Sequence, residues 1–202
     1  MSDVKTFYLN YDYRCPFARN LNEHVVTALK AGAPYNVIFT PFNLSQVHVP
    51  EDAPPIWDDP DREGDLMANE VGYIVSKKFP DQFYDTHIGL FRLRHDEGKS
   101  LRKFDELARV LETNGVDSEV VRNLLGAKTY SKDVRGLHES QVSEHDIFGV
   151  PTVYDDKKAA FIRIMSRPTS DSSASIELLE RAVDQVFKYS VFNEIKHSKV
   201  ER

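Results

Sequence analysis

The spacing of apolar positions changes along this chain, and each change predicts a different kind of element. Residues 5–12 and 35–44 carry the alternation and the aromatic and β-branched side chains that are typical of strands. Between them, residues 16–30 carry apolar side chains at helical spacing, with Pro16 suited to the first turn and Gly32 just past the end. This order of strand, helix and strand predicts a βαβ unit with parallel strands.

A helical block then interrupts the β pattern. Residues 49–64 are rich in prolines and acidic side chains, which predicts a surface loop. From 65 to 145 the apolar positions recur at helical spacing in successive groups, which predicts consecutive helices. Gly115 ends one of these helices, and Asp117 and Ser131 are placed to cap the next two.

The β pattern returns near the end of the sequence. Residues 149–156 and 159–165 predict a hairpin, and residues 176–187 predict a closing amphipathic helix. We therefore expect an α/β fold with an inserted all-helical subdomain. The expected segments are a core of residues 1–48 with 146–202, a connecting loop at 49–64 and the helical insertion at 65–145.

Composition and charge exclude several classes of function. The 202 residues are 41% hydrophobic and 29% charged, which is ordinary for a globular domain. The net charge of −6 comes without a basic stripe, so we expect no nucleic-acid partner. No apolar run reaches the roughly 20 residues of a membrane span and no targeting segment is evident, so we expect no membrane association. A single cysteine agrees with the reducing cytoplasm, and a homodimer is left open.

That cysteine, Cys15, is the main candidate for chemistry. It precedes Pro16 at the start of the first expected helix, where free N–H groups and the helix dipole favour thiolate over thiol. Arg14 and Arg19 add positive charge nearby in the sequence. We expect a partly exposed, reactive Cys15 with a lowered pKa, and the competing interpretation is an inert packing cysteine.

Two motifs carry a resemblance to a known family. Residues 15–18 read Cys-Pro-Phe-Ala and residues 149–152 read Gly-Val-Pro-Thr, in an order of elements that resembles the thioredoxin fold in its DsbA-like form. The segment "LFRLRHDEGK" resembles actinobacterial DsbA-family proteins, among them mycothiol-dependent nitroreductases. More distant resemblances are to kappa-class glutathione transferases and 2-hydroxychromene-2-carboxylate isomerases. The resemblance implies that Pro151 is cis and lies beside Cys15, and that the Val150 main chain binds substrate.

The sequence departs from the dithiol members of this family at Ala18, where those members carry a second cysteine. No intramolecular disulfide can form, so the leading hypothesis is a monothiol oxidoreductase. In it Cys15 attacks an oxidised or electrophilic substrate, and mycothiol or glutathione acts as cosubstrate, with no tightly bound cofactor. One alternative is a transferase or isomerase that orients a bound thiol cofactor, and another is a non-catalytic binding protein.

Neighbouring residues have two interpretations each. Tyr13 and Phe17 flank Cys15, and either contacts substrate or covers the core. Trp57, on the proline-rich loop, either walls a pocket or packs on its own domain. The seven histidines show no H-x-x-x-H or cysteine–histidine spacing, so no metal site is expected.

Overall fold

The computed structural model describes residues 4–189, 191–194 and 196–200. Residues 1–3, 190, 195 and 201–202, which belong to the expected core segments, lie outside the described residues. The described chain is an α/β protein, as the sequence predicts.

A four-stranded sheet lies at the centre of the fold, in the order β2-β1-β3-β4. Strands β1 and β2 are parallel and in register from the Lys5–Tyr35 pair to the Tyr11–Pro41 pair, which confirms the predicted βαβ unit. β3 runs antiparallel to both β1 and β4. The strands are β1 (Lys5–Tyr11), β2 (Tyr35–Pro41), β3 (Thr152–Tyr154) and β4 (Ala159–Phe161).

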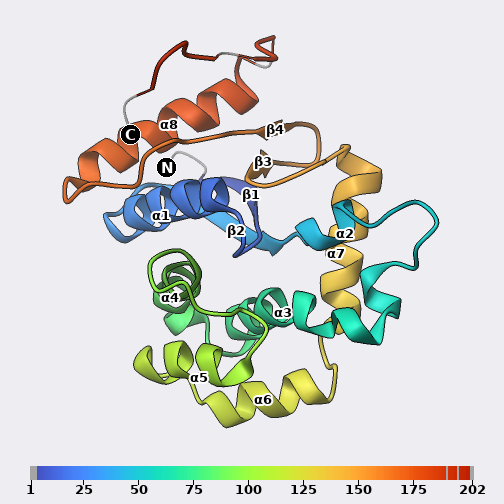
Figure 1. The fold of residues 1–202 in the computed structure, drawn as a ribbon. Coiled ribbons are helices and arrows are strands. Elements are labelled where there is room, and N and C mark those ends of the chain that lie inside the picture. The colour runs from blue at the N-terminus through green and yellow to red at the C-terminus, as the bar shows by residue number, and fades with distance from the viewer. Residues whose placement is uncertain (1–3, 190, 195, 201–202) are drawn as a thin grey trace.

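The helices form two groups around this sheet. Helices α1 and α8 pack against each other, whereas α3 packs against β2, α4 and α6. Figure 1 shows α8 at the top, α1 and the strands in the middle, and α3 to α6 in a lower layer. The helices are α1 (Pro16–Lys30), α2 (Leu44–Val47), α3 (Glu63–Lys78), α4 (Phe83–His95), α5 (Phe104–Thr113), α6 (Ser118–Gly126), α7 (Ser131–His145) and α8 (Ser172–Phe187).

Three sequence-based expectations need correction in detail. The predicted loop contains two short 3-10 turns, η1 (Ile56–Asp58) and η2 (Pro60–Arg62), and a third, η3 (Pro80–Gln82), precedes α4. Strand β4 ends at Phe161, so the alternation beyond it belongs to chain that has left the sheet. Asp117 caps α6 through its side chain, but Ser131 does not cap α7, because it is already the first helical residue.

Tyr13 fixes the distance between the sheet and the helical layer. Its hydroxyl hydrogen bonds to His87 Nδ1 on α4 at 2.8 Å. On α3, Gly72 provides the room, since a Cβ there would lie 2.3 Å from the Tyr13 hydroxyl oxygen. The chain therefore enters the Cys15 segment from a residue that is anchored in both layers.

Helix α7 connects the helical layer to the second motif. Gln141 donates from Nε2 to the Pro41 carbonyl at 2.9 Å, and His138 Nδ1 accepts from the Asn43 N–H at 3.1 Å. Asp146 ends the helix in the left-handed conformation, at φ 53°. The chain then turns back toward β1 and reaches residues 149–152 at the level of Cys15.

Candidate active site around Cys15

Cys15 is the N-cap residue of α1. Its backbone is extended (φ −87°, ψ 118°), and its Sγ accepts a hydrogen bond from the Ala18 N–H at 3.4 Å. The Cys15 N–H donates to the Asp12 carbonyl at 3.0 Å, which closes the turn between β1 and the helix. Pro16 occupies the first helical position, where its missing N–H leaves no donor unpaired. The sulfur is thus held where the free N–H groups of a helix start converge.

The second motif covers the sulfur. The Val150–Pro151 peptide bond is cis, and the Cys15 thiol donates to the Val150 carbonyl at 3.5 Å. Both residues are buried, with Val150 only 3% exposed. This contact joins Cys15 to a residue that lies 135 positions later in the sequence.

Asn10 of β1 holds the covering loop in place. Its Nδ2 donates to the Gly149 carbonyl at 3.1 Å, and its Oδ1 accepts from the Thr152 N–H at 2.6 Å. Thr152 adds a hydroxyl bond to the same Gly149 carbonyl at 2.8 Å. Sequence reasoning missed Asn10, although a fully buried amide within a strand is a signal of an obligatory hydrogen-bond partner.

The pKa of the Cys15 thiol is raised, which corrects the expected direction. Burial is the main cause, because it disfavours the charged thiolate, and the carboxylate of Asp12 acts in the same sense. The backbone N–H groups of Ala18 and Phe17 and the charge of Arg163 lower the pKa without offsetting the burial. The side chain is 8% exposed rather than partly open, so the resting group is a covered thiol.

Arg14 and Arg19 do not act on the sulfur as expected, because carboxylates engage both. Arg14 donates to the Asp65 carbonyl and carboxylate at 2.7 and 3.2 Å, and it also pairs with Asp12. Arg19 is buried and forms ion pairs with Glu23 and Asp96. Neither guanidinium contributes to the shift of the Cys15 pKa.

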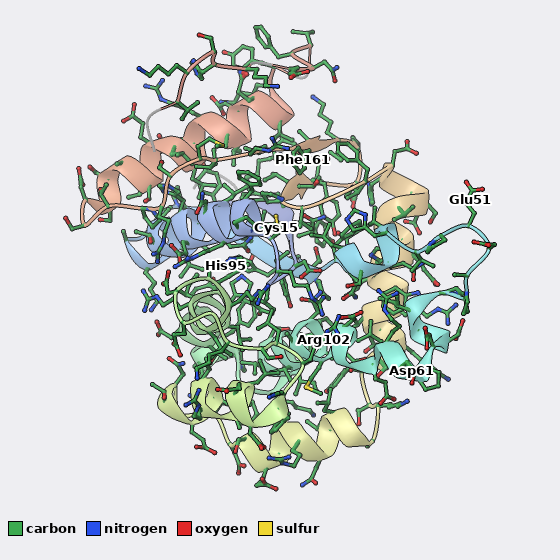
Figure 2. The ribbon with its side chains drawn as sticks, viewed as in Figure 1. Cys15, Glu51, Asp61, His95, Arg102 and Phe161 are labelled. Carbon is green, nitrogen blue, oxygen red and sulfur yellow. The ribbon has the colours of Figure 1, made fainter. Side chains whose placement is uncertain are left out.

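Arg163, which sequence reasoning missed, is the arginine whose charge lowers the pKa of the Cys15 thiol. The Arg163 guanidinium lies over the Phe17 ring at 4.7 Å and near the Phe161 ring at 5.7 Å. Phe161 in turn contacts Phe148, which is 70% exposed, with 5.5 Å between ring centroids. Figure 2 labels Phe161 and Cys15 among the side chains of this part of the molecule. One cation and three aromatic rings therefore form an accessible cluster, Phe17, Phe148, Phe161 and Arg163, next to the covered thiol.

Tyr13, in contrast to this cluster, is not placed to contact a substrate. It is fully buried, packs against Tyr11, His87 and Phe91, and offers no surface to a ligand. The expectation that it contacts substrate is therefore wrong for this structure, and the core interpretation holds. Its carbonyl hydrogen bonds to His95 Nε2 at 3.0 Å, so α4 supports the segment that leads into Cys15.

No protein-family model and no curated protein matches this chain. Solved structures do match it. BdbD from Bacillus subtilis aligns with a TM-score of 0.58 and 18% identity, over 92% of this chain and 89% of BdbD. DsbA from Pseudomonas aeruginosa aligns with 0.57 and 18%, over 91% and 82%. This chain has the DsbA-like thioredoxin fold.

A 2-hydroxychromene-2-carboxylate isomerase shares the same architecture. It aligns with a TM-score of 0.62 and 13% identity, over 93% of this chain and 99% of the isomerase. One fold thus accommodates thiol oxidoreductases and an isomerase. At these identities the likeness establishes the DsbA-like fold, and the chemistry has to be argued from the residues around Cys15.

Ala18 occupies the position three residues after the thiol in this DsbA-like helix. It is fully buried, and Cys15 is the only cysteine in the chain. A thiol–disulfide cycle within the chain is therefore excluded. Among the described residues, no group of three or more His, Cys, Asp or Glu side chains is placed to hold a metal ion. No helix in the described part of the chain is long and apolar enough to cross a membrane.

Proposed function

We propose that this protein is a thiol-dependent oxidoreductase that works through Cys15 alone. The observation that carries the proposal is the position of the sulfur between the Ala18 N–H and the Val150 carbonyl, at 3.4 and 3.5 Å. These are the two features that a helix-start nucleophile needs: donors that accept a developing thiolate, and an adjacent backbone that holds the substrate.

The first step begins from the covered thiol. When Cys15 loses its proton, the hydrogen bond to the Val150 carbonyl is lost and that carbonyl becomes free to accept a donor from the substrate. The thiolate keeps the groups that lower its pKa, which are the Ala18 and Phe17 N–H groups and Arg163. It attacks one sulfur of a disulfide R–S–S–R′. The S–S bond of the substrate breaks as the mixed disulfide Cys15–S–S–R forms, and R′–S⁻ leaves with the electron pair and takes up, through solvent, the proton that Cys15 released.

The second step needs a thiol from outside the chain, because Ala18 offers no sulfur. A low-molecular-weight thiol, mycothiol or glutathione, attacks the mixed disulfide, leaves as its own disulfide with R, and returns Cys15 as thiolate. The reductant is this small thiol and the oxidant is the substrate disulfide. A small thiol in reduced form is abundant in the cytoplasm, which is the compartment we propose.

The exposed cluster of Phe17, Phe148, Phe161 and Arg163 is the surface on which we place the substrate. Three aromatic rings suit an apolar or aromatic group, and the guanidinium suits a carboxylate. A substrate held there lies along the loop that carries Val150 and Pro151.

One observation favours a second function. Because the pKa of Cys15 is raised, its neutral S–H is available to donate a hydrogen bond, as it does to Val150. A neutral donor can orient and stabilise the thiolate of a bound small thiol without forming a covalent bond. This is the transferase or isomerase alternative, and the likeness to an isomerase structure is compatible with it.

Two variants separate these functions in two assays, the thiol-dependent reduction of hydroxyethyl disulfide and the addition of a small thiol to an electrophile such as 1-chloro-2,4-dinitrobenzene. Under the oxidoreductase proposal, Cys15→Ser and Cys15→Ala both lose activity to the uncatalysed rate, because neither supplies a sulfur nucleophile. Under the alternative, Cys15→Ser keeps activity toward the thiol-adding reaction, since a hydroxyl still donates, and only Cys15→Ala loses it. Full activity of the Cys15→Ala variant contradicts both functions and leaves the binding-protein interpretation.

A further inference from the structure

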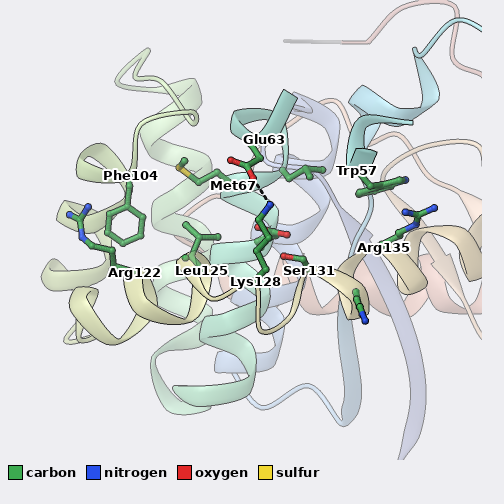
Figure 3. Close-up of a pocket in the computed structure, with 13 residues that line it drawn as sticks. Trp57, Glu63, Met67, Phe104, Arg122, Leu125, Lys128, Ser131 and Arg135 are labelled. Carbon is green, nitrogen blue, oxygen red and sulfur yellow. Dashed lines mark ion pairs between the residues drawn. The ribbon is translucent and has the colours of Figure 1, made fainter. Parts of the chain in front are cut away.

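A cavity far from the thiol chemistry lies among the helices of the lower layer. Its volume is 550 Å³, within the range of pockets that bind small molecules, and its walls come from η1, α3, α6 and α7 with the start of α5. Leu66, Met67, Phe104 and Leu125 give these walls an apolar surface. Trp57, the only tryptophan in the chain, also faces it. Figure 3 shows Phe104 and Trp57 toward opposite ends, with Met67 between them.

Three of the four cations that line this cavity, Arg122, Lys128 and Arg135, form ion pairs with carboxylates. Lys128 pairs with Glu63, drawn as a dashed line in Figure 3. Arg135 pairs with Asp58 at 3.1 Å, and it pairs with Glu139 as well. Arg122 lies over the Phe104 ring at 4.3 Å, and carboxylates of α5 and α6 neutralise it. At Arg122, Lys128 or Arg135 a ligand carboxylate would have to displace an acid, and the exchange of one exposed ion pair for another gains little.

Glu70, the other acidic residue of the cavity wall, differs from Glu63 in its surroundings. It is 9% exposed, and among the described residues no cation forms an ion pair with it. Its side chain bonds to Ser131, and burial raises its pKa, since Lys128 at a distance does not offset the loss of water. Lys132, the fourth cation of the wall, is exposed to solvent and forms no ion pair among the described residues. A buried carboxyl in an apolar cavity, without its own cation, is an acceptor for a cation that comes from outside.

We propose that this cavity binds an apolar amine and that Glu70 is its counter-ion. The apolar body of the ligand is buried against Leu66, Met67 and Leu125, and the ammonium group reaches the carboxylate of Glu70. Attraction between the two charges is stronger there than on the open surface because the Glu70 side chain is buried.

Trp57 makes the site directly measurable, because the emission of a single tryptophan on the wall reports occupancy. The probes are phenylbutylamine, its neutral analogue phenylbutanol and its anionic analogue phenylbutyrate, each titrated against the full chain. We expect saturable changes in Trp57 emission, with the amine bound about tenfold or more tightly than the alcohol and the carboxylate weakest. Equal affinity for amine and alcohol, or tighter binding of the carboxylate, would overturn the proposal.

Variants test the assignment of Glu70. Glu70→Gln keeps an acceptor for Ser131 and should weaken amine binding about tenfold while changing alcohol binding less than about twofold. Glu177→Gln removes the same charge from an exposed site on α8, where neither Glu177 nor its partner Arg181 lines the cavity, and should change neither affinity. Equal loss in both variants, or none in Glu70→Gln, contradicts the assignment.

A further pair of variants tests the cavity and its independence from the thiol. Leu125→Phe narrows the cavity without changing charge and should weaken both the amine and the alcohol; unchanged binding would place the probes elsewhere. Cys15→Ser should bind the amine as the wild type does. Loss of amine binding in that variant would contradict a separate site, whatever the fate of the proposed oxidoreductase activity.

Discussion

Replacing Ala18 by cysteine is expected to convert the mechanism from monothiol to dithiol. Residue 18 lies one turn into α1, and its N–H already contacts the Cys15 sulfur at 3.4 Å. Positions three apart on a helix bring their Cβ atoms to about 5–6 Å, and modest adjustment reaches the roughly 3.5–4.5 Å of a disulfide. The variant should therefore form an internal disulfide that the natural sequence cannot form.

The expected change in stability follows from burial and loop length. Ala18 is fully buried, so one added sulfur in the reduced variant costs roughly 1–3 kcal/mol of overpacking. Closing a loop of about four residues stabilises the oxidised form by about 2 kcal/mol on the chain-entropy model. The two effects nearly cancel. The reduced variant should melt roughly 2–4 °C lower for each kcal/mol lost, and the oxidised variant should melt close to the wild type.

Intact-mass measurement after a challenge with oxidised glutathione reads the mechanism itself. The wild type should retain a glutathione adduct on Cys15, whereas Ala18→Cys should resolve it into an internal disulfide and lose the adduct. Ala18→Ser, which is similar in size and cannot form the bond, is the matched control and should behave as the wild type. A stable adduct on Ala18→Cys would refute the inference that residue 18 is in the resolving position.

Three further predictions concern the thiol and its support. The rate of Cys15 alkylation by iodoacetamide should rise with pH to a midpoint above that of free cysteine, because burial raises the thiol pKa and only the thiolate reacts. A midpoint below that of free cysteine in the wild type would contradict the covered thiol. Asp12→Asn removes a nearby negative charge, so it should move the midpoint to lower pH. Tyr13→Phe loses the bond to His87 and should cost about 1 kcal/mol in urea unfolding with unchanged turnover, whereas reduced turnover would restore Tyr13 to the site. Gly72→Ala places a Cβ against the Tyr13 hydroxyl and should destabilise the fold by roughly 1–3 kcal/mol in thermal unfolding, and a neutral effect would show that the layers readjust.

The local parts of the fold could be predicted from the sequence because their signals are local. Helical spacing and Pro16 place α1 at Pro16–Lys30, and the alternation of the flanking runs gives the parallel pair β1 and β2. The ends of the strands could not be predicted in the same way. Apolar positions continue past Phe161, but the last bond between the two strands is the one from the Ile162 N–H to the Pro151 carbonyl, and no local pattern marks where this pairing stops.

The electrostatics of the site could not be predicted, because they depend on partners far along the chain. Arg14 looked available to Cys15, yet Asp65, 51 residues away, binds it. Arg163 approaches the start of α1 from the chain after β4, without any signal in the sequence near Cys15. Helix position alone favours a lowered thiol pKa, and burial of the sulfur in the folded chain is the main cause that reverses the direction.

The covered thiol has a consequence for how the proposed enzyme works. Cys15 rests as a neutral donor to Val150, so the thiol S–H and a donor group of the substrate compete for the same carbonyl. Substrates that bind the Val150 main chain therefore favour release of the sulfur. Such coupling would limit reaction with bystander disulfides, since the thiolate forms mainly where a substrate is already seated.

The monothiol mechanism is tested most directly on the wild-type chain. The chain is exposed to an oxidised small thiol, its adducts are mapped, and the reduced thiol is then added. We expect one mixed disulfide per chain, located on Cys15 by peptide mass spectrometry, that the reduced thiol removes at the rate of turnover. Absence of any adduct on Cys15 while turnover proceeds, or an adduct that forms and reverses far more slowly than turnover, would contradict the monothiol mechanism.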